Sequence, residues 1–210
     1  MFFCYDNDMN PKERMLAGLP YRANAGTLPQ DQLENKRKIY EYNFSRPDET
    51  EKRQSLLTAI LGKCGRNVTV LPPFHCDYGK HIEIGDGVFI NYNCVILDVC
   101  PVTIGARSLL GPNVCLAAAG HPVHPLSRQS GYEYGAPISI GQDVWLGAGV
   151  IVNPGIRIGD GSVIGAGSVV TKDIPGGVIA VGNPCRVLRP ITEEDRKFYF
   201  KKRVFDVTDY

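Results

Sequence analysis

Two histidines that could act in acid–base chemistry stand three residues apart in a stretch rich in glycine and proline. His121 and His124 follow Gly120 and flank the dipeptide at residues 122–123. Imidazole is the side chain whose ordinary pKa suits proton transfer near neutral pH. A histidine in a loop is often only a surface residue. These two lie in a segment that interrupts a regular repeat, which favours a catalytic role.

A zinc site is the other use that such histidines could serve. Zinc catalysis needs three protein ligands and one open coordination position. His121 and His124 could supply two ligands only if the loop folded back sharply, and no third histidine stands at a matching spacing. The sequence therefore disfavours a metal site, and we expect no metal.

A second group of chemically useful side chains lies near the end of the chain. Lys172, Arg186 and Arg189 form a cationic group in a sequence that is otherwise balanced in charge. Phosphate groups bind such clusters together with free backbone N–H groups, which the nearby glycine-rich turns can offer. Scattered surface charge is the alternative interpretation. The single tryptophan, Trp145, is expected to face outward, where an indole is typical of an interface or a ligand wall.

A six-residue repeat must position these side chains. Every sixth residue is a branched aliphatic over one long stretch of the chain. These residues are Ile140, Leu146, Val152, Ile158, Ile164 and Val170. Glycine often follows them, and the residue two positions earlier is small or β-branched. The same spacing runs through residues 84–102 and, after a slip of two, through residues 104–116.

This period predicts a three-sided coil. Residues two apart on a strand point to the same face, and glycine lets the chain turn a corner. Three such strands make a coil of about eighteen residues that must stack on its neighbours to bury its inner face. We therefore predict a mainly β protein with a parallel β-helix over residues 63–190. Residues 117–137 break the repeat and are expected to form an extruded loop that can reach a neighbouring subunit.

The two ends of the chain differ from the repeat. Residues 1–62 are predicted to form a helical cap, with a short helix from Pro11, a second over residues 31–40 and a third ending near Leu61. Asp48, with Glu51 three residues on, predicts a weak capping box for the third helix. Residues 191–210 are expected to form a tail that begins with a short helix.

Composition excludes several classes of function. The chain of 210 residues has 23 Lys and Arg against 22 Asp and Glu, so its formal charge is +1. This balance gives no overall basic field for nucleic acid or anionic lipid. Seven cysteines without a C-x-x-C pair fit a reduced, cytoplasmic chain better than a disulfide framework. With no signal peptide and no long apolar run, we expect a soluble protein without a nucleic-acid or membrane partner.

Several short motifs accompany the repeat. They are Asp77-Tyr-Gly79, Leu97-Asp-Val-Cys-Pro101, Gly120-His-Pro-Val-His124, Asp143-Val-Trp-Leu-Gly147, Val169-Val-Thr-Lys-Asp173 and Gly182-Asn-Pro-Cys-Arg186. Together with Arg14-Met-Leu-Ala-Gly18 and Tyr42-Asn43, they resemble the maltose and galactoside O-acetyltransferases of the hexapeptide-repeat superfamily. The resemblance implies a left-handed β-helix and a homotrimer with active sites between subunits. It also implies direct transfer of acetyl from acetyl-CoA to a sugar hydroxyl, the 6-OH group, without an acyl-enzyme.

The same resemblance implies roles for individual residues. His121 would be the general base that takes the hydroxyl proton, and Asn91 would bind the acceptor and steady the transition state. The backbone N–H of Ala148 would face the tetrahedral oxyanion. The implied coenzyme A contacts are Trp145, Ala148, Ala166, Thr171, Lys172, Arg186 and Arg189.

The acceptor side departs from the galactoside members. They carry an acidic residue in the N-terminal segment, where this chain offers only Asn24. They also carry Ser at the position of Asp77 and a second Asp at the position of Val99. The last two differences look like the maltose-type members, which favours a maltose- or glucose-type acceptor. Asp77 is the expected acceptor contact, because a carboxylate can accept two hydroxyl hydrogen bonds.

Other functions remain open at this point. A galactoside or xenobiotic (chloramphenicol-type) acetyltransferase could use the same scaffold. A metalloenzyme similar to the γ-carbonic anhydrases and a non-catalytic trimeric scaffold are alternatives from other classes.

Overall fold

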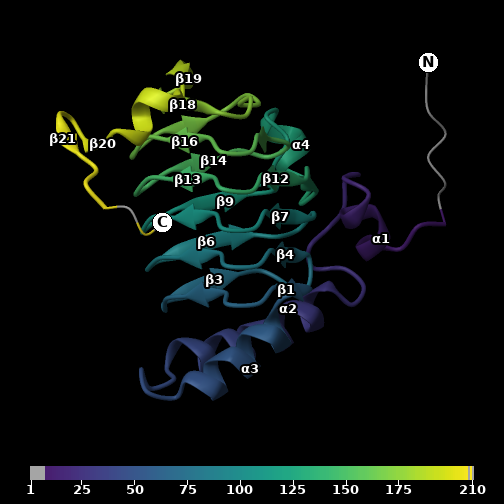
Figure 1. Ribbon diagram of the computed structural model, residues 1–210. Coiled ribbons are helices and arrows are strands. Elements are labelled where there is room, and N and C mark those ends of the chain that lie inside the picture. Colours follow the sequence, from purple (N-terminus) through teal and green to yellow (C-terminus); the bar gives the residue numbers. More distant parts are fainter. Residues whose placement is uncertain (1–7, 208, 210) are drawn as a thin grey trace.

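The computed structural model describes residues 8–207 and 209. Most of this chain winds through short strands into three stacked parallel sheets (Figure 1). The chain visits the three sheets in turn, so each coil contributes one strand to each sheet. The predicted mainly β architecture, a parallel β-helix, is therefore confirmed.

The three sheets contain five, seven and five strands. Sheet 1 contains β1 (Lys63–Cys64), β4 (Ile82–Ile84), β7 (Val102–Ile104), β12 (Ile138–Ile140) and β15 (Arg157–Ile158). Sheet 2 contains β2 (Thr69–Val70), β5 (Phe89–Ile90), β8 (Leu109–Leu110), β13 (Trp145–Leu146), β16 (Val163–Ile164), β18 (Val178–Gly182) and the antiparallel β19 (Cys185–Pro190). Sheet 3 contains β3 (Phe74–Cys76), β6 (Cys94–Leu97), β9 (Cys115–Ala117), β14 (Ile151–Val152) and β17 (Val169–Val170).

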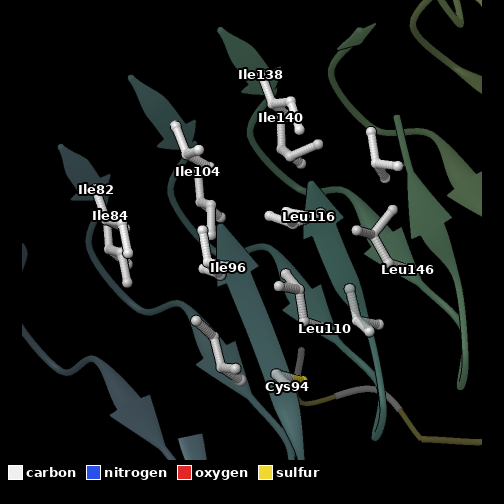
Figure 2. Packing of buried hydrophobic residues seen from close by; sticks show 14 of the residues in the cluster. Ile82, Ile84, Cys94, Ile96, Ile104, Leu110, Leu116, Ile138, Ile140 and Leu146 are labelled. Atoms are coloured by element: carbon white, nitrogen blue, oxygen red, sulfur yellow. The ribbon is translucent and has the colours of Figure 1, made fainter. Parts of the chain in front are cut away.

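The aliphatic residues of the repeat form the core. All six of the residues that define it are at most 2% exposed. Parallel pairing stacks equivalent residues of successive coils, so that Ile104 lies beside Ile140 and Ile140 beside Ile158. Figure 2 shows such side chains from several strands meeting in the interior. The small inward position of Cys94 is also buried, as the sequence predicts.

The outer faces of the three sheets differ in chemistry. Sheet 1 turns polar side chains outward, namely Lys63, Glu83, Thr103, Ser139 and Arg157. Sheet 2 presents apolar and aromatic side chains, including Leu109 and Trp145, which are 46% and 53% exposed. Sheet 3 presents Val95, Ile151 and Val169. Two of the three faces therefore leave apolar surface uncovered within a single chain.

The N-terminal helices take two separate positions. Helices α2 (Leu28–Asn43) and α3 (Thr50–Ile60) pack on each other and against the first coil, at the base of the β-helix (Figure 1). Helix α1 (Pro11–Leu16) contacts β11 (Tyr134–Gly135) in the extruded loop, and its Lys12 forms an ion pair with Asp31 of α2 at 2.8 Å. Within the described part of the chain, no helix combines the length and the apolar run needed to span a bilayer.

The start of α3 differs from the prediction. Its N-cap is Glu49, one residue after the predicted Asp48, and no side chain caps the helix. The Glu49 carboxylate instead accepts the backbone N–H of Arg46 at 2.8 Å, which tightens the turn before the helix. A capping box does form at α1, where Asn10 and Glu13 exchange hydrogen bonds with each other's backbone.

The C-terminal tail is helical only briefly. After β19, a single 3₁₀ turn covers Glu193–Arg196. A two-stranded hairpin follows, made of β20 (Phe198–Phe200) and β21 (Arg203–Val204). The chain reverses between the two strands at Lys201, whose φ of 52° lies in the left-handed region.

Candidate functional site

The candidate site residues fall on two edges of the three-sided β-helix. The corner between sheets 3 and 1, here called the loop edge, carries Asp77, Asp98 and the extruded loop. The corner between sheets 2 and 3, here called the Asn91 edge, carries Asn91, Ala148 and Ala166 after three strands of sheet 2. Among the described residues of one chain, His121 makes no recorded contact with the Asn91 edge.

The extruded loop is a closed hairpin rather than an irregular segment. Strand β10 (Ala119–Gly120) pairs antiparallel with β11, and Gly120 lies opposite Tyr134. The next residues outward are His121 and Glu133, so the stem of the hairpin places them across from each other. The short helix α4 (Pro125–Gln129) lies farther along the loop.

His121 has an acidic partner that sequence reasoning missed. Its Nε2 lies 3.8 Å from Oε2 of Glu133, with the His121 side chain 59% exposed and that of Glu133 19% exposed. The other carboxylate oxygen of Glu133 accepts a hydrogen bond from the hydroxyl of Tyr21 at 2.5 Å. The imidazole is thus open to a substrate, while the carboxylate behind it is held in place. The two residues meet because of the register of the β10–β11 hairpin. The sequence does not reveal that register, so the pair could not be predicted from it.

Asp77 lies on the same edge in a tight turn. One carboxylate oxygen of the fully buried Asp98 accepts the backbone N–H groups of Asp77 and Tyr78, each at 2.9 Å. Burial, the negative charge of Asp98 and that of Glu133 raise the pKa of Asp77 to about 6. The side chain lines a cleft of about 380 Å³ between α2 and sheet 3. Asp77 is therefore a partly buried hydrogen-bond acceptor close to the His121–Glu133 pair.

The Asn91 edge presents amide and aromatic groups. The Asn91 side chain accepts the N–H of Tyr92 at 2.8 Å and is half-buried. Ala148 and Ala166 are exposed on successive coils of this edge, and Trp145 lies on the adjoining outer face of sheet 2. No acceptor for the Ala148 N–H appears among the hydrogen bonds of the described residues. An exposed N–H of this kind can be aimed at a developing negative charge.

The predicted cationic residues occupy different surroundings. Thr171 and Lys172 are exposed after β17, at the upper end of the loop edge. Arg186 is exposed on β19, and its guanidinium donates to the carbonyl of Cys185 at 2.7 Å. Arg189 forms two hydrogen bonds with Asp195, at 2.7 and 2.8 Å. That pairing holds the pKa of Asp195 well below its usual range.

Two further predictions concern the acceptor side and metals. Asn24 is exposed in the turn before α2, three residues after Tyr21. Over residues 8–207, no three His, Cys, Asp or Glu side chains gather in a way that could hold a metal ion. The six cysteines within the described residues are free, and Cys4 lies outside them.

Comparison with known proteins places this geometry in a class. A family model described as a maltose acetyltransferase hexapeptide capping motif matches residues 14–65. A bacterial transferase hexapeptide model with six repeats matches residues 137–172. The fold and these matches define a hexapeptide-repeat acyltransferase.

Individual relatives narrow the class to a family. The chain is 47% identical to a galactoside O-acetyltransferase of Escherichia coli (strain K12), over 92% of this chain and 96% of the relative. The crystal structure of a maltose O-acetyltransferase from Clostridium difficile 630 is 48% identical, with a TM-score of 0.87, and covers 89% of this chain and 100% of its own. A galactoside acetyltransferase in complex with coenzyme A is 46% identical, with a TM-score of 0.92, over 95% and 100% of the two chains.

The chain belongs to the maltose and galactoside O-acetyltransferase family. It is an acetyltransferase, as the motifs predict, and the hydratase and inert-scaffold alternatives lose their support.

Proposed function

We propose that the protein transfers the acetyl group of acetyl-CoA to a sugar hydroxyl, with His121 as the general base. The observation that carries the proposal is an exposed imidazole that lies 3.8 Å from the Glu133 carboxylate and on the same edge as Asp77. The related galactoside acetyltransferase bound to coenzyme A supports the choice of co-substrate. The family relation supports a sugar as the acceptor.

In the proposed reaction, the imidazole takes the proton of the sugar hydroxyl while its oxygen attacks the thioester carbonyl. The N–H of Ala148 stabilises the tetrahedral oxyanion. Collapse of this intermediate breaks the carbon–sulfur bond, and the departing thiolate takes the proton back from the imidazolium. Glu133 favours the imidazolium while it exists, because an opposite charge at 3.8 Å stabilises the charged form. Free coenzyme A and the sugar acetate leave, and the side chains return to their starting state.

The remaining residues are assigned to the two substrates. Asp77 accepts hydroxyl hydrogen bonds from the sugar, with Asn91 and Asn24 as further acceptor contacts. Asp77 favours a maltose- or glucose-type sugar acetylated at the 6-OH group. Coenzyme A lies against Trp145 and contacts Ala148, Ala166, Thr171, Lys172, Arg186 and Arg189. The lysine and arginines serve its phosphates.

A complete site requires a second copy of the chain. His121 and Asp77 lie on the loop edge, whereas Asn91 and Ala148 lie on the Asn91 edge. The apolar outer faces of sheets 2 and 3 adjoin these edges and suit contact with another copy, while the polar face of sheet 1 suits solvent. We therefore include a homotrimer with its sites between subunits in the proposal. The proposal also divides the chain into a cap (1–62), a β-helix (63–190) and a tail (191–210). It further includes a cytoplasmic location.

A pair of histidine variants tests the base. His121→Ala should fold and assemble like the wild type but lose at least about 100-fold in turnover, because a general base contributes about 10²–10⁴ in rate. His124→Ala is the matched control, since it removes an exposed imidazole of the same loop. Release of free coenzyme A with maltose as acceptor measures both. Near-normal turnover by His121→Ala would remove the assigned base.

A further inference from the structure

Tyr21 is a buried residue of the N-terminal segment that lies beside the extruded loop. It is 1% exposed and belongs to a small apolar cluster separate from the main core. The other members of this cluster are Met15, Leu28, Tyr78 and Val99. Met15 lies in α1, and Val99 follows β6 on the loop edge. The cluster therefore fixes the ring of Tyr21 between the N-terminal segment and the β-helix.

The backbone of Tyr21 is joined to the loop at the position of Glu133. The N–H of each residue donates to the carbonyl of the other at 3.0 Å, which forms an isolated antiparallel bridge. A second contact follows one residue along, because the guanidinium of Arg22 lies over the ring of Tyr132, 4.8 Å from its centre. Two successive residues of the N-terminal segment thus hold two successive residues of the loop.

The side chains of the two bridged residues are joined as well. The Tyr21 hydroxyl donates to Oε1 of Glu133 at 2.5 Å, and Oε2 of the same carboxylate faces His121. Burial and the neighbouring carboxylate raise the pKa of Tyr21 above its ordinary value, so the phenol stays a donor at any working pH. A carboxylate held at one oxygen has fewer rotamers open to it, and its second oxygen stays near the imidazole.

We infer that Tyr21 is a positioning residue for His121, acting through Glu133. The inference rests on the proposed function, because it presumes that His121 is the base. It assigns to the N-terminal segment a part in the chemical step, in addition to its expected place beside the acceptor. Loss of this segment should therefore lower kcat as well as alter the choice of sugar.

The mechanism of this support is electrostatic and geometric. Glu133 stabilises the imidazolium that forms when His121 takes the hydroxyl proton, and it does so only while it stays ionised and close. The charged or titratable groups that face Glu133 are His121, Tyr21, Asp77 and Tyr78. Of these groups, Tyr21 is the one that donates a hydrogen bond to the Glu133 carboxylate and so holds it in place.

Tyrosine-to-phenylalanine variants isolate the hydroxyl from the ring. Tyr21→Phe should lower kcat by about tenfold and leave the KM for acetyl-CoA within twofold, since it removes one hydrogen bond to a charged group. Tyr42→Phe is the matched control. Its hydroxyl is also in a buried residue, 2% exposed, and donates at 2.5 Å to the carbonyl of Val70, away from the loop. Both variants lose one buried hydrogen bond, but only Tyr21→Phe should slow turnover.

A double-mutant cycle shows whether Tyr21 acts through Glu133. Glu133→Gln keeps an acceptor for the phenol but removes the charge, and should lower kcat more than Tyr21→Phe does. The kcat of the double variant should lie within about twofold of the kcat of Glu133→Gln. The reason is that the effects of two mutations do not add when one residue acts through the other.

The outcomes separate the inference from the proposed function. If Tyr21→Phe and Tyr42→Phe show the same kcat, or if the effects of Tyr21→Phe and Glu133→Gln multiply, Tyr21 has only a structural role. His121→Ala is measured alongside them. Full loss of turnover in that variant with an unaffected Tyr21→Phe overturns the inference alone, whereas retained turnover in His121→Ala overturns the proposed function.

Discussion

Asp77 is a carboxyl group whose charge depends strongly on its surroundings. Its pKa of about 6 is raised first by burial, then by the charges of Asp98 and Glu133. The folded protein therefore binds this proton more tightly than the unfolded chain does, and ionising Asp77 costs stability. That cost is absent below the ordinary pKa near 4 and fully present once the pH has risen above about 6. In the proposed reaction, the ionised form of this carboxylate is the one that accepts sugar hydroxyls.

Asp77→Asn should separate these two effects. The variant should be more stable than the wild type at pH 8 by about 1–3 kcal/mol, and this gain should vanish near pH 4. Its kcat/KM for the sugar should fall about tenfold at pH 8, because a hydrogen bond to a charged group is lost. Urea unfolding at several pH values and initial rates at varied sugar concentration measure the two quantities.

Asp48→Asn is the control for Asp77→Asn, since Asp48 is an exposed partner of Arg46. It should leave both stability and sugar kinetics unchanged within about 0.5 kcal/mol and twofold. An unaltered sugar KM in Asp77→Asn would take Asp77 out of the acceptor site. A fall in its stability at pH 8 would contradict the raised pKa.

The sequence predicts some site residues but not their partners. His121 could be found because its loop interrupts a strict repeat, and Asp77 because it stands in a recognisable motif. Glu133 and Tyr21 could not, because they are 112 positions apart and meet only where the N-terminal segment bridges the loop. The pairing of Arg189 with Asp195 was missed for a similar reason, as it depends on the 3₁₀ turn that follows β19.

At the scale of elements, packing at the corners of the coil explains why the six-residue repeat could be recognised in the sequence. A glycine after the inward aliphatic residue lets successive coils approach closely. At Gly85, an added Cβ would lie 2.6 Å from the backbone nitrogen of Ala106 in the next coil. Backbone atoms cannot move aside as a flexible side chain can, so the period of six is enforced by packing and appears in the sequence.

Gly85→Ala should therefore destabilise the β-helix more than an alanine at an open corner does. We expect a loss of about 3 kcal/mol in the free energy of unfolding, at the upper end of the cost of overpacking. Gly161→Ala is the comparison. Gly161 has a φ of +66° but nothing within 4 Å of an added Cβ, so only backbone strain of about 1 kcal/mol applies. Denaturant unfolding measures both, and equal losses would show that coil spacing does not constrain these corners.

Elements outside the repeat were less predictable because nothing periodic fixes them. The sequence predicts an extruded loop over residues 117–137 but not its conformation, and the pairing of β10 with β11 closes it into a hairpin. The capping box expected at Asp48 gave way to a hydrogen bond between Glu49 and the backbone of Arg46. The tail forms a hairpin after one 3₁₀ turn. In each case a local hydrogen bond decides between conformations that the residue types allow equally.

At the scale of the whole molecule, the separation of the two edges is the main constraint on function. Each chain carries one loop edge with His121 and one Asn91 edge with Ala148. In a closed ring of identical chains, the loop edge of each copy can meet the Asn91 edge of the next. Every copy then supplies its loop edge to one site and its Asn91 edge to another. A chain with a mutated loop edge and a chain with a mutated Asn91 edge can therefore form one intact site between them.

Complementation between two inactive variants tests this arrangement. His121→Ala and Asn91→Ala should each be nearly inactive as pure proteins. If they are co-refolded in equal amounts, about a quarter of all the sites in the sample combine an intact loop edge with an intact Asn91 edge. Turnover should therefore rise to about a quarter of the wild-type value, because random assembly sets that fraction. The variants mixed without refolding serve as the control, and a co-refolded sample that stays as inactive as its parents would place the whole site within one chain.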